Sequence, residues 1–252
     1  MRLIQTLKYV YKLRKVSFMQ TLWFNFRSLP LKQAKHLPIL LYHAEVAQIG
    51  RVYILGQVEF GMIRLGINMS SQCFSRPGIK IINRGMMEFE GPCFIGSNSV
   101  VETGKNGILH VGKNATVTGG CHICARKEIS IGENLSCSWD TSIFDTDFHV
   151  TVPFDEDLSV PVDIRYKNEP QAVHIGSNVW ICQGSLIQKG TIIPDWTIVA
   201  ARSLVRGCYN EYGAYNIIGG MPAKVLKKGV TRLEFLEFRH SPITSIIKYL
   251  GI

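Results

Sequence analysis

The clearest pattern in the chain is a β-branched aliphatic residue at every sixth position between residues 175 and 205. A period of six matches neither the 3.6-residue repeat of an amphipathic helix nor the two-residue alternation of a single strand. It predicts a three-sided coil in which each flat side contributes one inward aliphatic side chain and stacked coils pair as parallel strands. The six aliphatic positions are Ile175, Ile181, Ile187, Ile193, Val199 and Val205.

The same period continues upstream with interruptions. One run extends from Val111 to Ile129 and then shifts by two residues to Ile131, which we interpret as a loop or a bulge. After Phe148 the pattern stops in a segment rich in proline and acidic residues. The pattern is absent until the run that begins at Ile175, and an interruption of this length inside a solenoid is typical of a protruding functional loop. The sequence therefore predicts an all-β solenoid over residues 45–228 with a loop at 150–172.

The two ends of the chain lack the six-residue period. Near the N-terminus, apolar residues from Leu3 to Tyr11 fall on one side of a helix, with lysines on another. We therefore expect residues 1–44 to form a basic, amphipathic, helical arm. Residues 229–252 regain helical spacing and are expected to form a short tail that caps the open end of the solenoid, since the end coils of a solenoid must be covered.

Charge sets the arm apart from the rest of the chain. The formal net charge is +9, from 28 Lys and Arg against 19 Asp and Glu, and residues 1–44 hold eight of the basic residues and no acid. A basic, aromatic-rich arm suits an anionic membrane surface, so peripheral membrane contact through residues 1–35 is one expectation. Packing of the arm on the first coil is the alternative. Nucleic acid is less favoured as a partner, because no nucleic-acid-binding motif accompanies the charge.

The cysteine pattern bears on location and on metal binding. The seven cysteines form an odd set without the spacing of a disulfide framework, and neither a secretory leader nor a run of about 18 apolar residues is evident. We expect a cytoplasmic protein, with or without peripheral contact at the inner face of the membrane. Cys121 and Cys124 form a single C-x-x-C pair, which is a weak metal signal. We interpret both thiols as buried and structural, and we expect no metal.

Several segments resemble the hexapeptide-repeat acyltransferases, and most closely the branch that acetylates sugars and xenobiotics. They are residues 174–182, residues 219–225 and the Asp-Thr-Asp-Phe-His sequence at 145–149. Residues 24–26 and 29–33 resemble members associated with bacterial capsule and lipopolysaccharide synthesis. The resemblance implies a left-handed β-helix, a homotrimer with active sites at the subunit interfaces, and acetyl-coenzyme A (acetyl-CoA) as the acyl donor.

His149 is the candidate general base. Of the seven histidines, it stands where the repeat gives way to the loop, and it matches the family's catalytic position. Imidazole, with a reference pKa of about 6.5, can take a proton from a hydroxyl that attacks a thioester near neutral pH. Asp147 could orient the ring through Nδ1, as carboxylates do in catalytic triads. A backbone carbonyl is the alternative for that role, with Asp147 only solvated.

The resemblance also implies a set of coenzyme A contacts, in which basic side chains would face the phosphates. In the family a tryptophan lies close to the catalytic histidine, and Trp180 occupies the matching position. The alternative is that Trp180 only packs against its neighbours. The chain departs from the family at Cys182 and Arg202, where glycines are usual, and it has Gly119 and Gly120 where sugar-acetylating relatives carry an acceptor-side asparagine. The candidate coenzyme A residues are Trp180, Gln183, Ala201, Arg206, Lys224 and Lys227.

The predicted activity is acetyl transfer from acetyl-CoA to a hydroxyl of a free, nucleotide-linked or lipid-linked sugar during surface polysaccharide assembly. An amine acceptor and a longer acyl donor are variants of the same chemistry. One alternative is a metal-binding solenoid like the γ-type carbonic anhydrases, which hold zinc with three histidines from neighbouring coils; their H-x4-H spacing is absent. A second alternative is a non-catalytic scaffold at a membrane surface.

Overall fold

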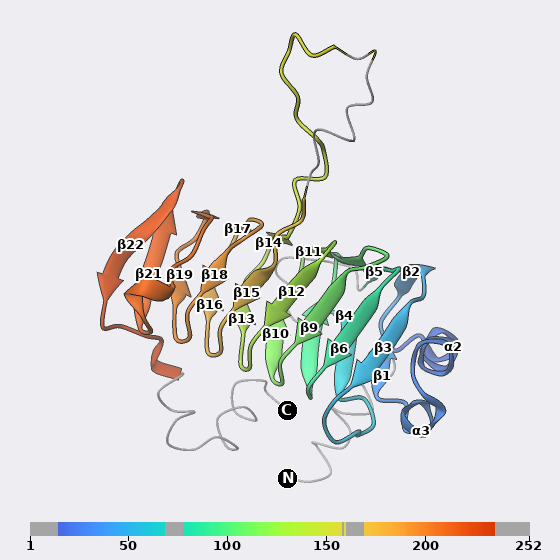
Figure 1. Ribbon diagram of the computed structural model, residues 1–252. Coiled ribbons are helices and arrows are strands. Elements are labelled where there is room, and N and C mark those ends of the chain that lie inside the picture. Colours follow the sequence, from blue (N-terminus) through green and yellow to red (C-terminus); the bar gives the residue numbers. More distant parts are fainter. Residues whose placement is uncertain (1–14, 69–77, 158, 160–168, 235–252) are drawn as a thin grey trace.

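Three β-sheets, parallel except for one antiparallel pair at the C-terminal end, wind around one axis in a computed structural model that describes residues 15–68, 78–157, 159 and 169–234 (Figure 1). Strands that follow one another in the chain enter different sheets. Along most of the solenoid each strand pairs in parallel with the third strand before it and the third after it. Consecutive strands therefore form the three sides of one coil, and the coils stack into a solenoid.

The sheets are named here in the order in which the chain enters them. The first contains β1 (Ile39–Leu41), β4 (Ile63–Ile67), β7 (Cys93–Gly96), β10 (Ala115–Val117), β13 (Ser136–Cys137), β16 (Trp180–Ile181), β19 (Ile198–Val199), β21 (Asn216–Gly220) and β22 (Ala223–Lys228). The second contains β2 (Ala44–Gln48), β5 (Ile79–Asn83), β8 (Ser99–Thr103), β11 (His122–Ala125), β14 (Ser142–Phe144), β17 (Leu186–Ile187) and β20 (Leu204–Val205). The third contains β3 (Arg51–Ile54), β6 (Met86–Phe89), β9 (Ile108–Val111), β12 (Glu128–Ile131), β15 (Val173–Ile175) and β18 (Ile192–Ile193).

The predicted aliphatic positions line the interior of the solenoid. All six residues of the run from Ile175 to Val205 are at most 3% exposed. Burial of such a side chain contributes about 1.5 to 3 kcal/mol, and each flat side of a coil supplies one or two of them. The small residues at the corners, such as Ser185 and Thr197, are buried as well. The six-residue period therefore identified the inward positions correctly.

The frame shift between Ile129 and Ile131 is neither a loop nor a bulge, so that interpretation was wrong. Both residues lie on the continuous strand β12, and both are at most 1% exposed. Side chains two positions apart on a strand point to the same face. The strands before the loop are long enough to direct two residues inward, and this lengthens the repeat by two without interrupting it.

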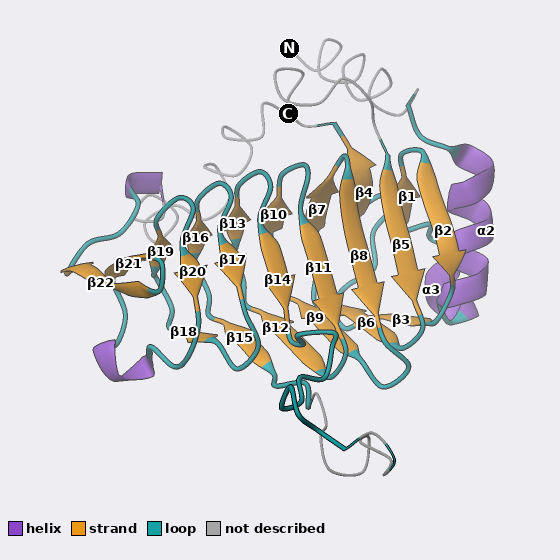
Figure 2. Ribbon diagram, turned by 90° about the horizontal axis from the view of Figure 1, so that it is seen from above, coloured by secondary structure: helices purple, strands orange, loops and turns teal. Residues whose placement is uncertain are grey.

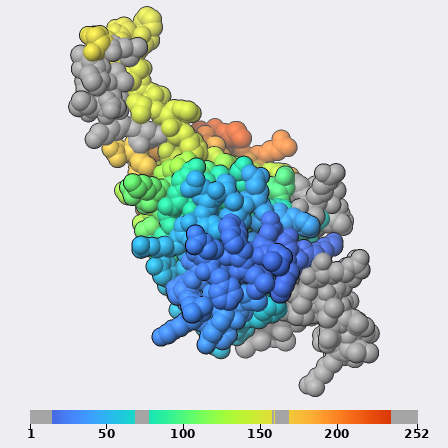
Figure 3. Space-filling model, turned by 90° about the vertical axis from the view of Figure 1, so that its right-hand side faces the viewer, coloured from blue at the N-terminus to red at the C-terminus, as the bar shows by residue number. Residues whose placement is uncertain are grey.

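Two helices, α2 (Phe18–Ser28) and α3 (Leu31–Ala34), cover the N-terminal end of the solenoid (Figures 2 and 3). β1 pairs with β4, so the first coil begins at Ile39, inside the range 1–44 that the sequence assigned to the arm. Residues 1–14 of the arm predicted for 1–44, and residues 235–252 of the tail predicted for 229–252, lie outside the described residues. Among the described residues, no helix is long and apolar enough to cross a bilayer.

At the N-terminal edge of each of the three sheets, side chains of α2 and α3 form hydrogen bonds with backbone groups of the first strand. Asn25 donates to the carbonyl of Ile39 (2.7 Å) and accepts from its N–H (3.2 Å), at the edge of the first sheet. Gln33 likewise donates to the carbonyl of Ile54 (2.7 Å) and accepts from its N–H (3.3 Å), at the edge of the third sheet. Gln20 donates to a carbonyl of β2 at 2.9 Å. Covering an edge in this way prevents its strand from pairing with another chain.

We expect Asn25→Ala to lower the free energy of unfolding by about 2 to 4 kcal/mol, because both backbone groups of Ile39 would lose their buried partner. The side chain of Asn25 is fully buried. Phe26→Ala is the matched control, since that side chain is 50% exposed. Urea unfolding followed by circular dichroism measures both variants, and equal stability of the two would contradict the proposed edge capping.

Candidate functional site

The predicted loop leaves the solenoid between the second and third sheets. β14 ends at Phe144 and β15 begins at Val173, and the described part of the chain between them projects away from the coils (Figures 1 and 2). The turns that connect second-sheet strands to third-sheet strands form one edge of the solenoid, which we call the loop edge. The residues of this edge determine how the loop is anchored.

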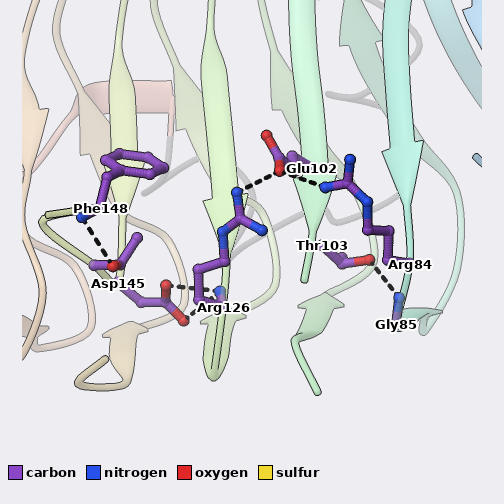
Figure 4. A network of polar contacts seen from close by, with 8 residues as sticks. Arg84, Gly85, Glu102, Thr103, Arg126, Asp145 and Phe148 are labelled. Atoms are coloured by element: carbon purple, nitrogen blue, oxygen red, sulfur yellow. Dashed lines mark hydrogen bonds and ion pairs between the residues drawn. The ribbon is translucent and has the colours of Figure 1, made fainter. Parts of the chain in front are cut away.

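Asp145, the first residue after β14, is fully buried and anchors the loop. The backbone N–H groups of Arg126, Lys127 and Glu128, in the turn of the preceding coil, donate to its carboxylate at 2.6 to 2.9 Å. Figure 4 shows the contact with Arg126. Burial raises the pKa of Asp145, and the three N–H donors oppose that shift. Its backbone carbonyl accepts from the N–H of Gln171 at 2.9 Å, so the outgoing and returning ends of the loop are joined at this residue.

A tight turn presents His149 at the base of the loop. The N–H of His149 donates to the carbonyl of Asp147 at 2.7 Å, and Phe148 between them has φ = 65°. This left-handed conformation is rare for an aromatic residue and costs about 1 to 3 kcal/mol. Thr146 Oγ1 accepts the N–H of Phe148 at 3.1 Å, and Phe148 packs edge-to-face on Phe144 with ring centroids 5.4 Å apart.

His149 itself is exposed. Within the part of the chain that the structure describes, its imidazole has no hydrogen-bond partner. Backbone strain of this kind persists where the surrounding structure enforces it, and it gathers at active sites. Trp196 and Tyr215 share this conformation, so the exposure of His149 at the base of the loop, rather than the strain, supports its functional assignment.

The carboxylate of Asp147 pairs with Lys189, which lies between β17 and β18 on the next coil. The distance from Lys189 Nζ to Asp147 Oδ2 is 2.5 Å. The contact between Asp147 and His149 that the structure shows is a backbone hydrogen bond. A role for the Asp147 carboxylate in orienting the ring stays a prediction.

Three of the candidate coenzyme A residues lie away from His149 in the same chain. Gln183 and Ala201 occupy turns that connect the first sheet to the second, and Trp180 lies on β16 in the first sheet. His149 lies on the loop edge, which is a different corner of the coil. One subunit therefore does not bring the two predicted groups together. Of the remaining candidates, Arg206 follows β20 on the loop edge, and Lys224 and Lys227 lie on β22.

The outer surface around Trp180 is covered by Arg232. The Arg232 guanidinium lies over the indole ring, 4.9 Å from its centroid, and also donates to Ser136 Oγ at 3.0 Å. Cys182, one of the two departures from the family pattern, is half-buried, and burial raises the pKa of its thiol. Arg202, the other departure, is exposed in a turn with φ = 53°.

A row of charged side chains follows the loop edge and was not predicted from the sequence. Glu102 accepts from Arg84 at 3.1 Å and from Arg126 at 2.5 Å, both through Oε1 (Figure 4). Arg126 also lies over the ring of Phe148, 5.9 Å from its centroid, so the row reaches the turn that carries His149. A sequence signal exists, because Arg84 and Arg126 each directly follow a second-sheet strand.

His122 and its flanking cysteines line the solenoid beside the loop. Cys121 and Cys124 are buried, and burial raises the pKa of the Cys124 thiol to about 11. His122 lies on the second sheet, whereas the two other repeat histidines, His110 and His174, lie on the third. Within the described ranges, no group of three or more His, Cys, Asp or Glu side chains is arranged to hold a metal ion.

Burial lowers the pKa of His122, and its Nε2 is buried without a hydrogen-bond partner. A lowered folded pKa means that His122 stabilises the fold fully above its unfolded pKa of about 6.5, and that this contribution is lost as pH falls below that value. The His122 ring packs edge-to-face on Phe144, with ring centroids 4.9 Å apart. His122→Phe should preserve an aromatic contact there and removes the titrating group. The variant should lose less stability than wild type between pH 7 and pH 5 in urea unfolding. Equal losses would exclude this contribution.

Comparison with known proteins shows which acetyltransferases the chain is similar to. WbbJ of Escherichia coli K12, assigned as a lipopolysaccharide biosynthesis O-acetyl transferase, is 29% identical over 155 residues, which cover 54% of this chain and 76% of WbbJ. The crystal structure of the polySia-specific acetyltransferase NeuO matches 85% of this chain and 88% of NeuO, with a TM-score of 0.50 and 15% identity. The chain has the fold of the hexapeptide-repeat acetyltransferases.

The predicted left-handed β-helix and the family resemblance are therefore confirmed. A chloramphenicol acetyltransferase of Morganella morganii is 43% identical over a shorter stretch of 54 residues, which cover 21% of this chain and 24% of that protein. No protein-family model matches the chain. All three proteins are named as acetyltransferases, in agreement with the predicted activity.

Proposed function

We propose that the chain transfers the acetyl group of acetyl-CoA to a hydroxyl of a sugar during assembly of a bacterial surface polysaccharide. The observation that carries the proposal is the exposure of His149 in a tight turn at the loop edge, where the loop leaves the solenoid. Two relatives support the chemistry, since WbbJ is assigned to lipopolysaccharide O-acetylation and NeuO to acetylation of polySia.

In the proposed reaction, neutral His149 accepts the proton of the sugar hydroxyl as its oxygen bonds to the carbonyl carbon of the thioester. The tetrahedral intermediate carries a negative oxygen, which a backbone N–H would stabilise. Collapse of the intermediate breaks the carbon–sulfur bond. The proton then passes from His149 to the leaving sulfur, so that the products are an acetyl ester and free coenzyme A.

The active site is proposed to form between subunits of a homotrimer. Support comes from the separation of His149 from Gln183 and Ala201, which lie on different edges of one solenoid. A second copy would bring the two groups together, with His149 from one subunit and the coenzyme A contacts from its neighbour. Basic side chains would bind the phosphates of the donor, as charge-assisted hydrogen bonds favour. They are Arg206, Lys224 and Lys227.

Mixing two inactive variants tests the shared site. His149→Ala removes the base, and Ala201→Trp blocks the donor channel, so each homotrimer should be inactive. An equimolar mixture that reassembles at random should regain about one quarter of wild-type turnover, because an intact His149 meets an intact Ala201 at one interface in four. Absence of recovery in trimers shown to be mixed by native mass spectrometry would place the site within one subunit.

A thiol-release screen tests the activity itself. Acetyl-CoA is supplied with a panel of free sugars, nucleotide-linked sugars and lipid-linked sugars, including amino sugars. Mass spectrometry and hydroxylamine sensitivity distinguish an ester product from an amide, and longer acyl-CoA donors run in parallel. Thiol release no faster than acetyl-CoA hydrolysis, with every acceptor, would reject the proposed function.

We also propose peripheral contact with an anionic membrane through residues 1–35, at the inner face of the membrane. Support comes from α2, which buries Phe24 and polar residues such as Asn25 while four of its other apolar residues are exposed. Exposed apolar patches of this kind mark interaction surfaces, and basic residues add about 1 kcal/mol each near anionic lipid. The exposed side chains are Phe18 (61%), Met19 (75%), Trp23 (49%) and Phe26 (50%).

Co-sedimentation with vesicles tests the membrane contact. The full chain should sediment with phosphatidylserine-containing vesicles and remain in solution with pure phosphatidylcholine. Trp23→Ser combined with Phe26→Ser should weaken binding without unfolding the helix, because both side chains are about half exposed. Equal sedimentation of the variant and the wild type would reject the contact.

A further inference from the structure

A strongly basic groove of about 600 Å³ lies at the N-terminal end of the loop edge, between α2 and the turns of the first coils. Four basic side chains line it, and no acidic residue is among the described residues of its lining. Its remaining polar surface is mostly backbone, from turns that contain Gly50, Gly85 and Gly107. The basic side chains are Arg27, Arg51, Arg84 and Lys105.

The basic side chains continue in a row from the groove to the loop. Each of the four coils before the loop contributes at least one at the loop edge, directly after or close after a second-sheet strand, and the exposed Lys127 follows Arg126 in the fourth. Adjacent strands are about 4.8 Å apart, so the row presents one positive charge about every 5 Å and reaches His149 after about 15 to 20 Å. In order along the edge they are Arg51, Arg84, Lys105 and Arg126.

One acidic residue, Glu102, lies inside the row. Its side chain is 12% exposed and accepts one hydrogen bond from Arg84 and one from Arg126 (Figure 4). A guanidinium has five N–H donors, so this contact fixes the orientation of both arginines and leaves donors for a ligand. The arginine side chains are 42% and 32% exposed. Further along the edge, Asp147 is paired with Lys189.

We propose that the groove and the row bind an acidic oligosaccharide, and that the acceptor of the proposed reaction is a glycan chain with several negative charges. One sugar of the chain would reach His149 while its neighbours lie along the loop edge. The inference rests on the proposed function for the reacting sugar, whereas the binding itself does not require it. Guanidinium groups match carboxylate and phosphate oxygens in pairs, which suits either anionic substituent.

The spacing of the charges favours a chain over a small acceptor. A single exposed ion pair contributes at most about a fivefold gain in affinity, so one charged sugar would gain little from the groove. Four basic residues at regular intervals can act together only on a ligand that extends over several coils. Binding should therefore strengthen with the length of the glycan.

Calorimetric titration of the full chain with oligogalacturonates tests this inference. A monomer, a dimer, a tetramer and a hexamer serve as probes, and maltooligosaccharides of equal length are the neutral controls. Affinity should rise with length for the acidic series, fall as salt is added, and be undetectable for the neutral series. Length-independent binding, or equal binding of both series, would overturn the proposal.

Arg51→Gln combined with Lys105→Gln should weaken binding of the acidic hexamer about tenfold, at about threefold for each lost contact. Lys80→Gln combined with Lys113→Gln is the matched control, because it removes the same charge outside the groove and should leave the affinity unchanged. An unaltered affinity of the groove variant would overturn the proposal. Weaker binding to anionic vesicles, with hexamer binding intact, would assign the groove to a membrane instead.

The test of glycan binding can fail or succeed independently of the test of acetyl transfer. Titration requires no turnover, so glycan binding without any thiol release would reject the acetyl transfer and retain the groove. Thiol release without length-dependent binding would retain the acetyl transfer and reject the groove.

Discussion

His149→Ala should lower acetyl turnover by about 100- to 10,000-fold and leave the unfolding midpoint unchanged. The loss of rate follows from removal of the base that takes the hydroxyl proton. Stability should be preserved because the ring is exposed and makes no hydrogen bond within the described residues. Saturating thiol-release assays and thermal unfolding measure the two effects.

Val150→Ala is the matched control for this variant, because Val150 is also exposed (46%) and adjacent in the loop. It should retain turnover within about twofold. Near-normal turnover of His149→Ala, with the acceptor that the screen identifies, would remove His149 from the mechanism.

The pair formed by Asp147 and Lys189 gives a test of the orienting role. If the Asp147 carboxylate positions the imidazole, Asp147→Asn should lower kcat and move the pH profile, whereas Lys189→Gln should have a smaller effect. If the carboxylate serves only the ion pair, both variants should behave alike, with a small change in kcat and an unmoved pH profile. Comparison of the two pH profiles decides between these roles.

Asp145→Ala should lower the free energy of unfolding by about 3 kcal/mol or more and reduce turnover as well. Its carboxylate is the acceptor for the N–H groups of Arg126, Lys127 and Glu128, and loss of a buried acceptor leaves each donor unpaired. Turnover should fall because the same carboxylate holds the start of the loop that carries His149. Urea unfolding and thiol release measure the two effects.

Two further variants show whether the loss arises from the hydrogen bonds of Asp145. Asp145→Asn preserves the size of the side chain but places an amide group against N–H donors, so an intermediate loss is expected. Glu45→Ala removes a carboxylate that is 68% exposed and should cost less than about 1 kcal/mol. A change of less than 1 kcal/mol for Asp145→Ala would show that water replaces the carboxylate at this turn.

The fold could be predicted because the spacing of buried aliphatic residues that specifies it is a short-range pattern in the sequence. Each flat side of a coil must bury at least one aliphatic side chain, so the positions from Ile175 to Val205 record the geometry directly in the sequence. The start of the solenoid was less visible, since β1 is only three residues long and is identified as a strand by its pairing with β4. Its edge is closed by Asn25, which is 14 residues away in the chain.

The candidate base was also visible, because His149 stands where the period ends and a family motif surrounds it. The role of Asp145 could have been inferred from strand alternation, which directs it to the same side as Ile143 and so into the interior. A buried carboxylate requires donors, and a turn of the neighbouring coil supplies them. The sequence alone did not identify that turn.

The sequence by itself determined the repeat, the position of the loop and the histidine at its base. The tertiary structure decided which charges face one another across coils. Glu102 meets Arg84 at a separation of 18 residues and Arg126 at a separation of 24, while Asp147 meets Lys189 across the whole loop. These separations follow the lengths of individual coils, which vary along the solenoid. A constant period therefore predicts what each coil buries, but only the stacked register shows which side chains meet along the loop edge.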